Sequence, residues 1–204
     1  MLFMETVIEK TQTKNASRTD SLSKTNGKAR VRSEESINRF LLKHDGYEYV
    51  KGNLEKKNMP NAKHSGIAGR LVIELGIYLK KNKIGRVYPE AHFQIGKDKR
   101  IPDVAFVESA KIPETGEPQK FWDFAPDLAI EIVSPTDFYQ DVLEKIDDYL
   151  VAGVKQVWLI NPEKETLTIY FSSSETKLLT KKDVLTCEDI LPKFNVKLSE
   201  IFVD

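Results

Sequence analysis

The sequence predicts one mixed α/β (α+β) domain over residues 34–204, preceded by a polar arm over residues 1–33. Three observations support this fold class. A long segment repeats apolar residues at helical spacing, two segments alternate apolar and polar residues, and a strand, a helix and a second strand follow one another between Asp127 and Ile160. The chain has 204 residues, of which 40% are hydrophobic, which is enough for one core.

The charge balance and the cysteine content exclude several classes of protein. The 31 basic residues match the 31 acidic ones, so the chain is not a polycation that holds nucleic acid by bulk charge. No apolar run is long enough for a membrane span, and the start of the chain shows no signal peptide, so we expect a cytoplasmic protein without a membrane partner. The single cysteine, Cys187, cannot form an internal disulfide.

The arm, residues 1–33, is the first element. It carries few large apolar side chains and several basic ones, so it cannot bury enough surface to offset the entropy of ordering. We expect a disordered or loosely docked arm. A solubilising tail is favoured over a nucleic-acid-binding arm.

The first half of the domain should contain two helices and a hairpin. Ser33, followed by acidic residues, marks a helix start, and His44-Asp45-Gly46 ends that helix. Residues 47–50 and 53–56 are predicted as two short strands of a hairpin. Pro60-Asn61 then introduces a helix to about Lys81, with apolar residues on one face.

Strands dominate the segment that follows. The alternation from Arg86 to Ile95 predicts one strand, Gly96–Arg100 a charged turn, and Ile101–Val107 a second strand. Residues 112–118 are predicted as a loop because proline and glycine interrupt them.

The last predicted elements form a crossover. Residues 127–133 are nearly all apolar, as expected of a strand buried on both faces. A helix over residues 138–152 ends at Gly153, and strands follow at residues 154–160 and 166–171.

Two carboxylates stand out in these strands. Glu131 interrupts an apolar strand, where an unpaired carboxylate would cost several kcal/mol, so it needs a cation, a hydrogen-bonded partner or a cleft. A structural Glu paired with a nearby lysine is the alternative. Asp103 lies near the start of a second apolar strand, and if the two strands are neighbours the two acids converge. A hard cation such as Mg²⁺ would relieve their repulsion.

Lys145 is the third candidate residue. The helix that carries it packs back on the sheet, so its side chain can reach toward Glu131. The alternative is an ordinary surface ion pair with Asp141, four residues earlier.

These residues carry a resemblance to a known family. Pro102-Asp103, the block Pro126-Asp-Leu-Ala-Ile-Glu131-Ile-Val-Ser-Pro135, Lys145, Tyr149 and Ala152–Trp158 resemble the Uma-type restriction endonuclease family, which is abundant in cyanobacteria. The resemblance covers about residues 35–200. It implies a restriction-endonuclease-like core of the PD-(D/E)xK superfamily, with a central mixed β-sheet flanked by helices, which cuts phosphodiester bonds with magnesium.

The resemblance also implies roles for individual residues. Asp103 and Glu131 match the metal-binding acids, and the Ile132 carbonyl completes the implied Mg²⁺ ligands, with Mn²⁺ as a substitute. The usual lysine position is Val133 here, which departs from the superfamily pattern, and Lys145 matches a lysine that has moved to the following helix. Glu55 matches a further acid that completes the metal shell or orients water.

His64 matches a recurrent family histidine. A structural histidine at a helix start is an equally good interpretation. Gln140 and Asp141 are weaker candidates. Asp127 lies four residues before Glu131 on one strand, roughly 13 Å away, so we assign it to strand capping.

The function that follows is a Mg²⁺-dependent endonuclease acting on nucleic acid, with DNA as the favoured substrate. The competing hypothesis is a non-catalytic nuclease-fold module that binds nucleic acid or protein. Five cations are candidates for phosphate contacts, although a solvated surface charge is the favoured interpretation of each: Lys63, Arg70, Lys97, Lys99 and Arg100. A homodimer is a candidate assembly, because cutting both strands of a duplex requires two active sites or two cleavage events. Zinc chemistry is not expected, because the three histidines lack zinc spacing.

Overall fold

The computed structural model describes residues 33–135 and 137–203, which belong to one compact unit, Arg32–Asp204. The predicted arm lies outside the described residues except for Ser33, whose hydroxyl caps the first helix. No helix in the described ranges is long and apolar enough to cross a membrane. The elements are α1 (Glu34–Lys43), β1 (Tyr47–Val50), β2 (Asn53–Lys56), α2 (Ala62–Asn82), β3 (Gly85–Pro89), β4 (His92–Ile95), β5 (Asp98–Arg100), β6 (Val104–Glu108), a 3₁₀ turn η1 (Ser109–Lys111), β7 (Phe121–Trp122), β8 (Leu128–Ile132), α3 (Tyr139–Val151), β9 (Gln156–Asn161), β10 (Thr166–Tyr170), β11 (Thr176–Thr180), β12 (Val184–Cys187), β13 (Leu191–Lys197) and α4 (Leu198–Ile201).

A six-stranded mixed sheet forms the centre, in the order β11-β10-β9-β8-β6-β3. Strands β8 and β9 are parallel and are joined through α3, so the predicted crossover is confirmed. The other pairs in this sheet are antiparallel. Every residue of β8 is buried, because the strand lies inside the sheet and both of its faces are covered.

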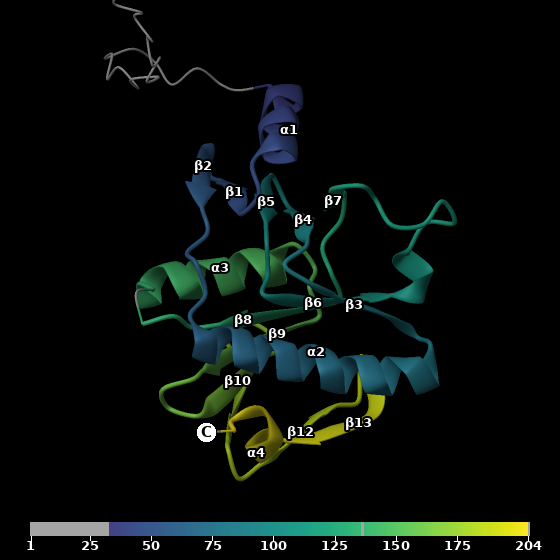
Figure 1. Ribbon diagram of the computed structural model, residues 1–204, viewed down its shortest axis with the longest axis vertical. Coiled ribbons are helices and arrows are strands. Elements are labelled where there is room, and N and C mark those ends of the chain that lie inside the picture. Colours follow the sequence, from purple (N-terminus) through teal and green to yellow (C-terminus); the bar gives the residue numbers. More distant parts are fainter. Residues whose placement is uncertain (1–32, 136, 204) are drawn as a thin grey trace, which may run out of the picture. The chain divides into compact units, whose positions relative to one another are not determined.

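Helices α2 and α3 cover opposite faces of this sheet (Figure 1). The apolar stripe of α2, from Ile67 to Leu79, packs against Phe106, Ile130 and Trp158. On the other face, Ile146 and Tyr149 of α3 pack against the small side chains of Ala105, Ala129 and Val157. Since side chains alternate along a strand, Glu131 lies on the α3 face of β8. The fold class is thus a mixed α+β fold with helices flanking a mixed sheet.

Two smaller sheets accompany the central one. The order of the five-stranded sheet is β2-β1-β5-β4-β7, and β12 pairs with β13 in a hairpin. The hairpin and α4 extend the core on the α2 side, where the Tyr78 hydroxyl donates to the Pro192 carbonyl at 2.8 Å. The five-stranded sheet matters for the site because it supplies residues to it from β1 and β5.

The sequence interpretation of residues 86–100 was wrong in two respects. The expected single strand from Arg86 to Ile95 is broken at Glu90, whose φ of 50° is left-handed, so that β3 and β4 belong to different sheets. The expected charged turn is confined to Gly96 and Lys97, and residues 98–100 form β5 between β1 and β4. Two positive side chains, Lys99 and Arg100, are consequently buried.

Candidate functional site

Asp103 directly precedes β6 and Glu131 lies in β8, and these two strands are neighbours, which is the condition that the sequence argument required. Strands β6 and β8 pair antiparallel with Val104 opposite Ile130, so continuing this register by one residue places Asp103 opposite Glu131. The Ile132 backbone N–H donates to Asp103 Oδ2 at 2.7 Å, which fixes the aspartate against β8. Both carboxylates are buried, with 2% and 8% of their surface exposed.

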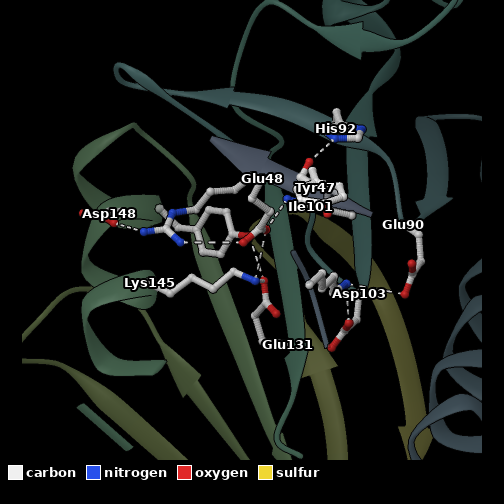
Figure 2. Close-up of polar contacts among 12 residues, drawn as sticks. Tyr47, Glu48, Glu90, His92, Ile101, Asp103, Glu131, Lys145 and Asp148 are labelled. Atoms are coloured by element: carbon white, nitrogen blue, oxygen red, sulfur yellow. Dashed lines mark hydrogen bonds and ion pairs between the residues drawn. The ribbon is translucent and has the colours of Figure 1, made fainter. Parts of the chain in front are cut away.

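Helix α3 brings two further groups to Glu131. The Lys145 ammonium lies 2.9 Å from Glu131 Oε1, and the Tyr149 hydroxyl donates to the same oxygen at 2.7 Å. The two residues are four apart on one helix face, so both side chains reach the sheet. Figure 2 shows Lys145 directed at Glu131. Lys145 therefore does not form the surface pair with Asp141 that the sequence left open.

The β1–β2 hairpin contributes a third carboxylate, which sequence reasoning missed. Glu48 of β1 accepts from the Ile101 backbone N–H at 2.6 Å, and its Oε1 lies 3.5 Å from the Lys145 ammonium (Figure 2). On its other side, Glu48 lies 4.0 Å from the Arg100 guanidinium, which also binds Asp148 of α3. The alternation along β1 is a sequence signal that could have found it, because it places Glu48 on the same face as Val50, and both are buried.

Asp103 contacts two basic side chains of its own, Lys57 and His64. The Lys57 ammonium lies 2.7 Å from Oδ1, and His64 Nε2 lies 3.0 Å from Oδ2. His64 is in the first turn of α2, where its backbone N–H donates to the Asn61 side chain at 2.9 Å. Lys57 precedes α2 and was not singled out in the sequence, because nothing local distinguishes it from the other lysines of the hairpin.

The surroundings move the pKa values of the two acids in opposite directions. Burial alone would raise the pKa of Asp103, but the hydrogen bond with His64 and the charge of Lys57 outweigh it and hold that pKa well below its usual range. Burial raises the pKa of Glu131, and Lys145 opposes this only in part. Of the two acids, Asp103 is thus the one whose ionised form is favoured more strongly.

Asp103, Glu131 and Glu48 form a buried cluster with the cations Lys145, Lys57 and His64, and the pKa values of these three cations are all raised. Burial lowers the pKa of Lys145, but the charges of Glu131 and Glu48 outweigh it, and the net pKa lies above its ordinary value. The pKa of Lys57 is likewise raised, because Asp103 and Glu131 outweigh its burial. Asp103 raises the pKa of His64 against the effect of burial. Lys145 is therefore held as an ammonium at neutral pH.

The cluster forms the floor of a cleft of about 420 Å³. Its walls come from the segment between β2 and α2 and the segment between β8 and α3. Glu55, in β2, also lines the cleft; its side chain is exposed, and it pairs with Glu48 across the β1–β2 hairpin. Asp141 and Ile132 line the cleft as well. The lining carries six carboxylates and four lysine or arginine cations, so it has an excess of negative charge.

The donor set fits a magnesium ion that keeps several of its waters. Such an ion needs only one or two protein carboxylates. Asp103 Oδ1 is buried, and within the described residues it pairs with the Lys57 ammonium at 2.7 Å. In that part of the chain, no three His, Cys, Asp or Glu side chains group closely enough to enclose a metal ion. The carboxylates suit a hydrated hard cation rather than a protein-only cage.

The candidate phosphate contacts are placed differently from one another. Lys99 is buried, bonds the Gln94 side chain and lies 4.5 Å from the Phe121 ring centroid, so it is not a surface charge. Arg100 is buried in the cluster. Arg70 donates to the Ile201 carbonyl at 2.7 Å, and Lys63 pairs with Glu163 at 3.2 Å. Lys97 is exposed. Only Arg100 of these five lines the cleft.

Asp127 and Gln140, the remaining residues considered in the sequence, lie outside the cleft lining. Asp127 accepts from the Glu108 backbone N–H at 2.9 Å and so caps the end of β6, with Lys111 and Lys155 as ionic partners. Gln140 is exposed in the first turn of α3 and does not line the cleft.

Comparisons with known proteins identify a family and a similar solved structure. The model of the family described as "Uma2: Putative restriction endonuclease" matches residues 40–199. A crystal structure described as "a putative nuclease belonging to DUF820 from Anabaena variabilis ATCC 29413" is similar, with a TM-score of 0.73 and 27% identity over 81% of this chain and 96% of that chain. No curated protein matches the chain. Together the family and the solved structure support a nuclease-like function, and the chain belongs to the Uma2 family.

Proposed function

We propose that the protein is a Mg²⁺-dependent endonuclease of the PD-(D/E)xK type that hydrolyses phosphodiester bonds of DNA. The observation that carries this proposal is the convergence of Asp103, Glu131 and Lys145 on the floor of one cleft, from adjacent strands and the following helix. The family match and the similar nuclease support the reaction class.

Asp103 and Glu131 would hold the metal ion. When bound, the ion supplies an acidified water and neutralises charge on the phosphate. Asp103 is suited to this task because His64 and Lys57 keep it ionised and the Ile132 N–H fixes its orientation. Tyr149 orients Glu131 by donating to Oε1.

Lys145 is proposed to stabilise the transition state. Because its pKa is raised, it remains an ammonium and donates to the negative charge that develops on the phosphate oxygens. It stays near Glu131 and Glu48, which hold it at the cleft floor before substrate enters. This role differs from removal of a proton from water, for which a lysine needs a lowered pKa.

The test combines metal binding with cleavage. Isothermal titration of Mn²⁺ or Mg²⁺ is run on the wild type, Glu131→Gln and Asp103→Asn, with Glu163→Gln as a control because Glu163 lies in an exposed pair outside the cleft. Cleavage is assayed on supercoiled plasmid, circular single-stranded DNA and RNA. We expect metal-dependent cleavage of DNA by the wild type and the control, lost in both cleft variants.

Other outcomes separate the alternatives. Cleavage of RNA alone would contradict the DNA assignment. Neither metal binding nor cleavage of any substrate by the wild type would overturn the nuclease and favour a non-catalytic binding module.

A further inference from the structure

Two large apolar side chains face solvent at the mouth of the cleft. Met59 is 85% exposed and Phe138 is 76% exposed, and both line the cleft. The other strongly exposed apolar residues, such as Tyr139 and Val151, do not line it. Apolar and aromatic side chains that line a cleft are the groups that commonly contact a ligand there.

The two residues lie in different segments of the chain, which are joined by a side-chain hydrogen bond. Met59 lies in the segment between β2 and α2, and Phe138 is the residue that precedes α3. The Asn58 side-chain amide donates to Asp137 Oδ1 at 3.4 Å, which links these segments. Asp137 also accepts from the Ser134 backbone N–H at 2.8 Å, so the carboxylate next to Phe138 has two fixed partners.

The size and charge of the cleft restrict what can enter it. A volume of about 420 Å³ is that of a small-molecule pocket, so only a short part of a nucleic-acid strand lies inside it. Its excess of carboxylates means that phosphate contacts alone give little affinity. A nucleobase stacked on an aromatic ring gives affinity without needing positive charge.

We propose that Phe138 and Met59 form a base-stacking clamp, and that the substrate is a DNA strand with unpaired bases, such as a single strand, a loop or a flap. The base stacks on Phe138 and contacts Met59, while its phosphate reaches down to Lys145 and to the metal ion that Asp103 and Glu131 would hold. This inference rests on the proposed nuclease function and specifies its substrate.

The test measures binding of a fluorescent single-stranded oligonucleotide by anisotropy, in Ca²⁺. Phe138→Ala should bind about 5- to 150-fold more weakly than the wild type, which corresponds to the loss of one stacked base. Phe138→Trp should restore binding, with quenching of the new tryptophan. Tyr139→Ala is the matched control, because Tyr139 is an adjacent exposed aromatic residue outside the cleft lining.

Two further probes address the substrate class. The same strand with abasic sites should bind the wild type as weakly as the intact strand binds Phe138→Ala, and the matching duplex should bind more weakly than the single strand. Equal affinity of the wild type and Phe138→Ala would overturn the clamp, as would tighter binding of duplex. A change in oligomeric state in Phe138→Ala with unchanged DNA binding would assign this face to self-association instead.

The outcomes distinguish this inference from the proposed function. If the wild type cleaves DNA and Phe138→Ala binds and cleaves equally well, the clamp fails and the nuclease stands. If the wild type neither binds nor cleaves DNA, the proposed function fails and the clamp fails with it.

Discussion

Replacing Asp103 by asparagine tests the electrostatic description of the cleft floor. Asn keeps the shape and can still accept from the Ile132 N–H, but it removes the negative charge that lies 2.7 Å from the Lys57 ammonium. Breaking a buried ion pair on one side costs about 3–5 kcal/mol. Lys57 keeps a second acid, Glu90 at 3.4 Å, and His64 can lose its proton, so we expect the low end, about 3 kcal/mol.

Urea unfolding followed by tryptophan fluorescence measures this loss, because Trp122 and Trp158 are buried. For a domain of this size, about 3 kcal/mol corresponds to a melting temperature lower by roughly 6–12 °C. Glu163→Gln is the control and should change stability by less than about 1 kcal/mol, since its pair with Lys63 is exposed.

The pH dependence gives a second, independent check. Asp103 has a lowered pKa in the folded state, so its stabilisation is present above the unfolded pKa of about 4 and is lost as the pH falls through the folded pKa. The difference between wild type and variant should therefore be full at pH 7 and shrink below about pH 4. A loss under about 1 kcal/mol at pH 7, or one that does not change with pH, would refute the reasoning.

Three further predictions concern single groups. Tyr149→Phe should cost about 1–3 kcal/mol in urea unfolding, because Glu131 Oε1 loses a buried donor at 2.7 Å, and a change under about 0.5 kcal/mol would contradict the hydrogen bond. Gly85→Ala should cost about 1–3 kcal/mol, because its Cβ would lie 2.3 Å from the Val107 carbonyl oxygen. Gly76→Ala, with open space around it on α2, should instead be neutral or stabilising, and equal effects of the two would refute the steric argument. The Cys187 thiol, whose pKa burial raises to about 11, should react with a thiol reagent at neutral pH only after unfolding, so prompt labelling of the native protein would contradict its burial.

The meeting of Asp103, Glu131 and Lys145 could be predicted because it depends on short-range rules. A buried strand followed by a helix and a parallel strand fixes where the helix packs, and that places Lys145 over Glu131. The neighbouring strand position of Asp103 needed one further assumption, the β6–β8 pairing, which the structure confirms.

The hairpin residues could not be predicted in the same way. Glu48 and Lys57 reach the cluster through a second sheet, and nothing in the local sequence specifies how that sheet docks. Its formation also explains why Lys99 and Arg100 were misjudged, because a charged segment resembles a turn until its strand partners, β1 and β4, are known.

The residues of the cleft floor lie far apart along the chain, and this has a consequence during protein synthesis. The hairpin that carries Glu48 and Lys57 is made first, whereas Lys145 and Tyr149 follow about a hundred residues later, or roughly 5–20 s at ordinary ribosomal rates. Until α3 emerges, the acids of the cleft floor lack the helix that orients Glu131. On the proposed function, an incomplete nascent chain is therefore inactive, and the activity begins only when the whole βαβ unit has closed.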